Sequence, residues 1–153
     1  MISVIVTASA DAEAFARLLS ALVPGAAEGL VREVAVIGAV GASRTVADEM
    51  GADLFEAGGF AQAFSQTRGD WVVGLPPGVG LADDWIDRLA AHVSCDPPAA
   101  ARLVTRSGFP SLGFGREGWL VPKRLAASAA LVEQDLQRLA RRSGVRLRIL
   151  DRR

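Results

Sequence analysis

The chain has little of what builds disulfides, metal clusters or membrane spans. Its 153 residues include one cysteine, Cys95, and one histidine, His92. A single cysteine cannot close an internal disulfide or form a redox pair, and this favours a cytoplasmic setting. The apolar runs are broken by glycine, proline or charge well before the roughly 20 residues that a membrane span needs. No basic stretch precedes the short apolar segment 2–7, as one would in a signal peptide.

Half of the residues are hydrophobic and 22% are charged, which suits one hydrophobic core in a chain of this length. We therefore expect residues 1–153 to form a single domain. The formal net charge is zero, but residues 1–101 sum to −8 and residues 102–153 to +8. Either the two halves interleave in one fold and neutralise each other, or the second half forms a basic surface. Such a surface would suit phosphates or an anionic membrane, including a peripheral position on the membrane's inner face.

Strand and helix signals alternate along the first half of the chain. Apolar and β-branched runs predict strands over Ile2–Thr7, Glu33–Ile37, Asp53–Glu56 and Trp71–Leu75. We expect Ser9 to cap the first helix, and Pro24 and Gly25 to stop it. Ser43 is expected to cap a short second helix. Four strands alternating with helices predict an α/β fold with a mainly parallel sheet and helices on both faces.

The second half is less regular. Its predicted elements are a helix that begins at Asp83 and Asp84, strands over Ala101–Thr105 and Trp119–Pro122, a helix from Val132 to Ser143, and an edge strand over Val145–Leu150. Between the first two of these strands, the glycine-rich segment from Arg106 to Gly118 is a candidate loop or lid.

Two segments that follow predicted strands are candidate ligand contacts, because ligands of open α/β sheets bind at the carboxyl ends of the strands. One is Pro76, Pro77 and Gly78, where the fourth strand must end. The other is the Gly38–Ser43 loop, in which Gly41 and Ser43 could help to present amides and a helix N-terminus to a phosphate. An ordinary turn explains the second segment equally well.

These motifs together resemble the family-two glycosyltransferases over nearly the whole chain. Arg68-Gly69-Asp70-Trp71 matches the family closely, and Gly41, Ser43 and Thr45 are remnants of its Gly-Ser-x-Asp-Gly-Thr loop. Residues 117–124 look like the family's strand and turn on the acceptor side. The resemblance implies a fold of the GT-A type and a nucleotide-sugar donor.

The acids of that family are missing here. Pro76-Pro77-Gly78 occupies the place of its Asp-x-Asp motif, which holds a metal ion and the diphosphate, and Gly38 replaces the acid that reads the nucleotide. A hard divalent cation needs several oxygen ligands, so we expect no bound metal and no cofactor. Asp83 and Asp84 could substitute as ligands, although acids in the first turn of a helix more commonly act as caps.

Glu133 falls at or beside the family's Glu-Asp base motif. An inverting transfer needs one carboxylate to accept the proton of the acceptor hydroxyl. Glu133 and Asp135 would point about 200° apart on a helix and could not act as a pair, so Glu133 is the candidate base. The alternative is an acid at a solvated helix start. Trp119 is a candidate for stacking on a sugar.

Two functions remain open. The first is an enzyme that transfers a sugar from a nucleotide diphosphate without a tightly bound metal, with Arg116, Lys123 and Arg124 neutralising the diphosphate. The second is a non-catalytic descendant that keeps the fold as a binding or regulatory module. A dinucleotide-binding domain is excluded because no Gly-x-Gly-x-x-Gly follows the first strand. The expected partners are a nucleotide sugar or another anionic small molecule and an anionic membrane, and no nucleic acid. Reversing Lys123 and Arg124 to glutamate should abolish anion binding without a folding defect.

Overall fold

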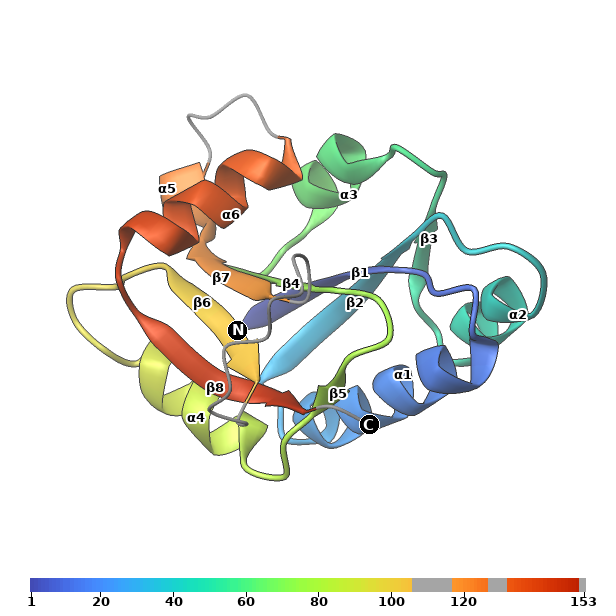
Figure 1. Ribbon diagram of the computed structural model, residues 1–153, viewed down its shortest axis with the longest axis horizontal. Helices are drawn as coiled ribbons and strands as arrows, with labels where there is room; N and C mark the ends of the chain where they lie inside the picture. The colour runs from blue at the N-terminus through green and yellow to red at the C-terminus, as the bar shows by residue number, and fades with distance from the viewer. Residues whose placement is uncertain (106–116, 127–131, 152–153) are drawn as a thin grey trace.

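The computed structural model describes residues 1–105, 117–126 and 132–151 (Figure 1). Within these residues eight strands form one mixed sheet in the order β3-β2-β1-β4-β7-β6-β8-β5. In chain order the elements are β1 (Ile2–Thr7), α1 (Ala12–Ala27), β2 (Val31–Ile37), α2 (Gly41–Glu49), β3 (Asp53–Phe55), α3 (Phe60–Gln66), β4 (Trp71–Leu75), β5 (Gly80–Leu81), α4 (Trp85–Val93), β6 (Ala101–Thr105), β7 (Gly118–Pro122), α5 (Lys123–Ala126), α6 (Glu133–Arg142) and β8 (Arg146–Asp151).

The first half of the chain forms a parallel half-sheet around β1. Val4 of β1 lies opposite Val34 of β2 on one side and Val73 of β4 on the other, and β3 extends the parallel pairing beyond β2. The predicted α/β fold is confirmed, with β1 buried except at Thr7 and β4 ending at Leu75. Proline at 76 has no N–H to continue the strand.

The sheet changes direction at β7, which pairs antiparallel with both β4 and β6. Gly74 near the end of β4 lies opposite Trp119 near the start of β7, and Trp71 lies opposite Pro122. The segment that follows β7 therefore lies at the amino end of β4. The predicted edge strand β8 pairs parallel with β6 and is flanked at its end by β5. The two-residue β5 was not predicted, because so short a strand shows no alternation of apolar and polar residues in the sequence.

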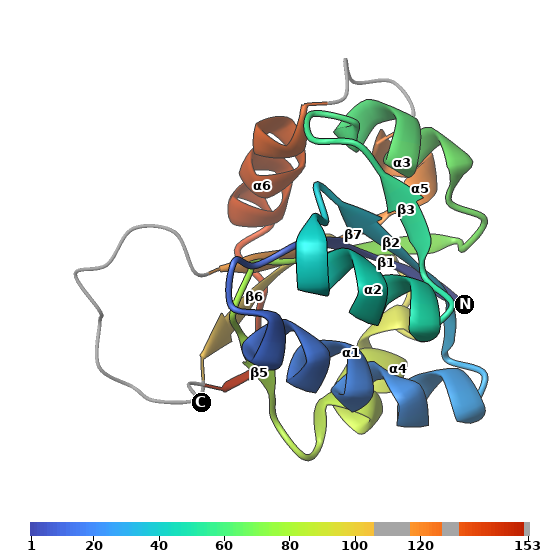
Figure 2. The ribbon, with the colours of Figure 1, turned by 90° about the vertical axis from the view of Figure 1, so that its right-hand side faces the viewer.

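Helices cover both faces of the sheet (Figure 2). Val4 and Val6 of β1 point to the face that α1, α2 and α4 cover, whereas Ile5 points to the face of α3, α5 and α6. Alternate residues of a strand point to opposite faces, so a strand buried on both is apolar at nearly every position, and the buried Ser3 is the exception in β1. Among the helices of the described residues, none combines the length and the apolarity needed to cross a membrane.

Helix α1 differs from its prediction at both ends. Its N-cap is Asp11, whose Oδ1 accepts from the amides of Glu13 (3.1 Å) and Ala14 (3.0 Å), while Ser9 Oγ accepts from the amide of Asp11 (3.2 Å). The helix also continues through Pro24 to Ala27. Gly25 in this last turn packs closely on α4, because a Cβ on it would lie 2.4 Å from Cη2 of Trp85. Only a glycine at this position allows α1 and α4 to approach so closely.

Candidate functional site

The parallel strands bring most of the predicted ligand contacts to one edge of the sheet. Thr7 pairs with Ile37, and Val6 pairs with Leu75, so β1, β2 and β4 end together. We call this end of the sheet the carboxyl edge. The predicted contacts that follow β2 and β4 there are Gly38, Gly41, Ser43, Pro76, Pro77 and Gly78. The segments predicted as ligand contacts thus lie at the edge where ligands of open α/β sheets commonly bind.

The loop after β2 is held by the protein's own hydrogen bonds. The amide of Gly38 donates to the carbonyl of Phe55 (2.9 Å), and the positive φ of Gly38 (72°) suits glycine. Ser43 is buried, and its Oγ donates to the carbonyl of Ser9 (2.8 Å). Ser43 therefore ties the segment after β1 to the start of α2. It does not cap that helix as predicted, because α2 begins at Gly41 after the N-cap residue Val40.

The turn after β4 offers backbone oxygens and no carboxylate. Pro77 is exposed, Pro76 and Gly78 are partly exposed, and Gly78 has a positive φ of 68°. Asp84, a candidate substitute ligand, accepts from Arg88 Nε (2.7 Å) at the start of α4. In the ranges that the structure describes, no group of three or more His, Cys, Asp or Glu side chains is placed to hold a metal ion.

Trp119 and Glu133 lie together above the end of β4. The Trp119 side chain packs on Gly74, where a Cβ would lie 2.0 Å from the indole, and Phe60 meets the ring edge-on at 6.0 Å between centroids. Trp119 Nε1 donates to Glu133 Oε1 (3.3 Å). Trp119 is only 1% exposed, so its ring has no free face for a sugar. Its indole N–H instead orients the half-buried Glu133 at the start of α6.

Lys123 and Arg124 lie at the opposite end of the sheet, which we call the amino edge. They follow Pro122, the partner of Trp71 at the start of β4. Four strand steps of about 3.3 Å, or ~13 Å, separate this position from the end of β4. Arg116, the third predicted cation, lies outside the described residues. The structure therefore does not bring Lys123 and Arg124 together with Pro76–Gly78.

The two cations also differ from each other. Lys123 is partly buried, its Nζ donates to the carbonyl of Thr67, and its amide donates to the carbonyl of Asp70 (2.8 Å). Arg124 is exposed. Lys123→Glu would remove the hydrogen bond that Nζ donates to the carbonyl of Thr67 at the end of α3, and would place a carboxylate near that carbonyl. The sequence alone suggested that neither reversal would affect folding. From the structure we expect Lys123→Glu to destabilise the fold and Arg124→Glu to leave its stability unchanged.

The amino edge also holds a network of polar side chains. The sequence did not indicate that these residues contact one another. Glu33 Oε1 accepts from Ser3 Oγ (2.5 Å) and from the amide of Arg68, and its Oε2 accepts from Arg68 Nε (2.7 Å). The amide of Gly69 donates to Ser3 Oγ (2.8 Å). The Arg68-Gly69 part of the family-like motif thus closes the start of β4 onto β1 and β2. The only signal in the sequence is a serine in an apolar strand.

The chain matches no protein-family description and no curated protein sequence. It is, however, similar in structure to solved glycosyltransferases. One is glucosyl-3-phosphoglycerate synthase from Mycobacterium tuberculosis, solved with Mn2+, UDP and glucosyl-3-phosphoglycerate (TM-score 0.67, 18% identity, 100% of this chain and 72% of that one). A second is mannosyl-3-phosphoglycerate synthase from Rubrobacter xylanophilus (TM-score 0.66, 13% identity, 84% and 55%). A third is S. aureus TarS 1-349 (TM-score 0.64, 11% identity, 99% and 60%).

These similarities establish the fold. The chain has the GT-A-like α/β architecture, with a mixed and mostly parallel sheet. At identities of 11–18% they do not by themselves carry a substrate or a reaction to this chain.

Proposed function

We propose that this protein is a non-catalytic, glycosyltransferase-like module that binds a nucleoside diphosphate or nucleotide sugar at the carboxyl edge without a metal ion. The observation that carries the proposal is the chemistry of that edge. Gly38 and Pro76-Pro77-Gly78 follow β2 and β4, and none of them has a carboxylate to hold a divalent cation. The fold is retained while the groups that family-two enzymes use there are absent.

Two features support nucleotide binding at this edge. A structurally similar protein was solved with UDP and Mn2+. In the present chain the N-terminus of the nine-residue helix α2 follows Gly38 at the carboxyl edge, and no side chain caps it. A helix N-terminus presents amides and a partial positive charge, both of which favour a phosphate.

The distribution of charge supports the loss of catalysis. When a sugar is transferred, negative charge develops on the departing diphosphate, and a metal ion or a cationic side chain must stabilise it. Of the three cations predicted to replace the metal, Lys123 and Arg124 lie within the described residues, and both are at the amino edge. A nucleotide at the carboxyl edge would therefore be bound without their help.

One observation favours a second candidate, a metal-independent inverting transferase. The Trp119 indole fixes the Glu133 carboxylate near the end of β4. In this reaction Glu133 would take the proton of the acceptor hydroxyl while that oxygen bonds to the anomeric carbon. The bond from that carbon to the diphosphate oxygen would break, which releases the nucleoside diphosphate.

Calorimetry and a release assay separate the two candidates. UDP- and GDP-sugars are titrated into the wild-type protein in metal-free buffer, and released nucleoside diphosphate is then measured with a panel of acceptors. We expect binding of at least one nucleotide sugar and no release above the protein-free rate. Absence of binding to every nucleotide would contradict the proposal. Release that is lost in Glu133→Gln but retained in the matched variant Asp135→Asn would establish the transferase instead.

A further inference from the structure

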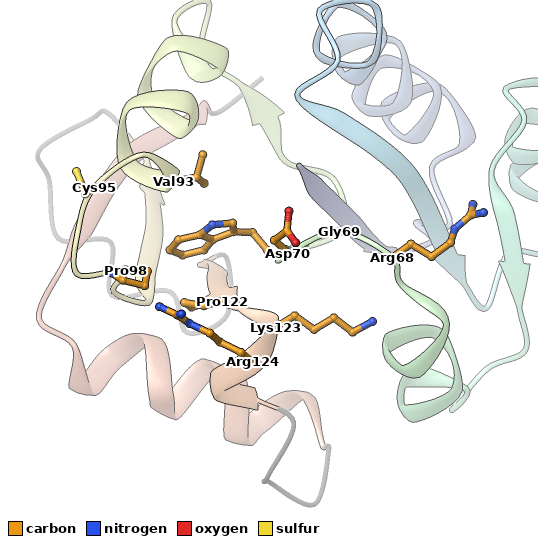
Figure 3. A pocket seen from close by; sticks show the side chains of 10 residues that line it. Arg68, Gly69, Asp70, Val93, Cys95, Pro98, Pro122, Lys123 and Arg124 are labelled. Carbon is orange, nitrogen blue, oxygen red and sulfur yellow. The ribbon is translucent and has the colours of Figure 1, made fainter.

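A pocket of about 610 Å³ opens at the amino edge (Figure 3). The proposed nucleotide site lies at the opposite end of the strands, at the carboxyl edge. The start of β4, the end of α4 with the segment after it, and the end of β7 form the walls of the pocket. Its apolar lining comes from Trp71, Val93, Pro98 and Pro122. Sites for small molecules commonly occupy about 300–1,000 Å³ and combine an apolar lining with a few polar groups. The volume and lining thus suit a small organic molecule.

Two of the three cations that line the pocket are committed elsewhere. Arg68 Nε donates to Glu33 Oε2 (2.7 Å), and Lys123 Nζ donates to the carbonyl of Thr67. Figure 3 shows both side chains extending away from Pro98. The Arg124 side chain extends in the other direction, toward the side of the pocket on which Figure 3 shows Pro98. Within the described ranges no ion pair of Arg124 is found, so its charge remains available to a ligand.

The acid in the lining is Asp70, which restricts where an anion can lie. Its side chain is 84% exposed, and its Oδ2 lies 3.2 Å from the amino group of Met1. Figure 3 shows its carboxylate and the Arg124 guanidinium pointing to different sides of the pocket. The favourable position for a negative group is therefore at Arg124, and Pro98 and Pro122 belong to the apolar lining of the same pocket.

We infer that the amino-edge pocket binds a small organic acid, with its phosphate or carboxylate on Arg124 and its apolar body against the partly exposed Val93 and Pro98, over the largely buried Trp71 and Pro122. A guanidinium can bind two oxygens of such a group at once. The site is independent of the nucleotide site because the length of β4 separates the two. A molecule held here would bridge β4, the end of α4 and α5, and would stabilise their packing when bound.

The single cysteine offers a direct test, because Cys95 lines this pocket and is exposed. The rate at which N-ethylmaleimide alkylates Cys95 is followed by mass spectrometry, with phenyl phosphate as the probe. We expect phenyl phosphate to slow alkylation at concentrations at which inorganic phosphate and phenol do not. Equal protection by inorganic phosphate would contradict the apolar part of the inference. Absence of protection by phenyl phosphate would overturn the site.

Charge reversal locates the anion. Arg124→Glu should weaken phenyl phosphate binding about tenfold or more, measured by calorimetry and by the loss of Cys95 protection. The matched control is Arg142→Glu, an equal charge change at an exposed position of α6, which should bind as the wild type does. Circular dichroism melting curves check that both variants fold. Unchanged binding in Arg124→Glu would overturn the inference. Nucleotide binding by this variant should equal that of the wild type, so each proposal can fail without the other.

Discussion

Glu33 is an ionised acid held inside the fold by its partners. Its side chain is 7% exposed. Burial by itself raises the pKa of Glu33, but hydrogen bonds from Ser3 and Arg68 and the charge of Arg68 outweigh it and hold the pKa below the ordinary value of 4.5. The same contact raises the pKa of Arg68 above its ordinary value. An acid with a lowered pKa stabilises the fold above its unfolded-state pKa, and that stabilisation is lost as the pH falls through the folded-state value.

Glu33→Gln should lower the free energy of unfolding at pH 7 by about 2 kcal/mol, because it removes charge-assisted hydrogen bonds to the Ser3 hydroxyl and Arg68. The difference from the wild type should shrink as the pH falls from 4.5 through the lowered pKa of the folded protein, where the Glu33 carboxylate of the native wild type becomes protonated. Urea unfolding at several pH values measures both effects. Glu13→Gln in the exposed Glu13–Arg17 pair is the control and should cost less than about 0.5 kcal/mol. A constant difference at all pH values would contradict this account of Glu33.

Gly74 shows how one missing side chain shapes the candidate site. The Trp119 ring occupies the space where a Cβ would stand, and from there its indole N–H reaches Glu133. Gly74→Ala should therefore force the ring to move and destabilise the protein by about 1–3 kcal/mol.

The indole N–H signal of Trp119 in an NMR spectrum should shift in Gly74→Ala, while that of Trp85 on the other face of the sheet should not. Gly51→Ala is unsuitable as a control. The backbone at Gly51 has a φ of 71°, so alanine would be strained there even though the position is exposed. Ala42→Ser, at an exposed position outside the core, serves instead. Wild-type stability and an unmoved Trp119 signal in Gly74→Ala would show that the ring is not constrained as described.

At the scale of an element, α1 continues past a residue that normally ends a helix. Proline lacks the amide that would donate to the carbonyl four residues earlier, and in a helix interior it costs about 3 kcal/mol. Pro24 lies in the last turn and is exposed, so only part of this cost applies. The following glycine packs closely on Trp85, and this contact supports the last turn.

Pro24→Ala should raise the free energy of unfolding by about 1 kcal/mol, because alanine restores the missing donor and favours the helix. Alanine also leaves the unfolded chain more flexible, which keeps the gain below the full interior value. Thermal unfolding measures the change. Val23→Ala, at the neighbouring exposed position, is the control and should have a smaller effect. A loss of stability in Pro24→Ala would mean that the proline itself helps to define the end of α1.

At the scale of the whole molecule, the reversal of β7 separates two sets of residues that the sequence suggested for one ligand. Neutral groups follow β2 and β4 at the carboxyl edge, and the cations Lys123 and Arg124 follow β7 at the amino edge. A diphosphate at the carboxyl edge would meet backbone groups and a helix N-terminus instead of a metal or these cations.

Mn2+ or Mg2+ should therefore leave the affinity for UDP or a UDP-sugar unchanged. Gly38 and Pro76–Gly78 supply no carboxylate to hold a cation beside the diphosphate. Calorimetric titrations with excess metal and with a chelator measure the difference, and titration of the metal into buffer containing the nucleotide alone corrects for their direct association. A large gain in affinity with metal would show that the assignment of Pro76–Gly78 to the Asp-x-Asp place is wrong.

Local pattern predicted the elements well because periodicity, caps and breakers are local properties. The spans of β1, β4 and β6 were predicted to the residue, and β2, β3 and β8 within a few residues. Prediction failed where a distant contact decided the outcome. Pro24 did not end α1, in which the next residue, Gly25, packs on the distant Trp85. Ser43 did not cap α2 because the helix begins earlier, at Gly41, and within it the Ser43 hydroxyl donates to the carbonyl of Ser9.

The sequence by itself determined the alternation of buried strands and helices, and with it the carboxyl edge where Gly38 and Pro76–Gly78 gather, since parallel strands that follow one another must end together. Only the tertiary structure decided on which edge Lys123 and Arg124 lie. A short apolar strand has the same composition whether it runs parallel or antiparallel to its neighbour. The direction of β7 is set by pairing with β4 and β6 and by the packing of Trp119 on Gly74, contacts between residues far apart in the chain.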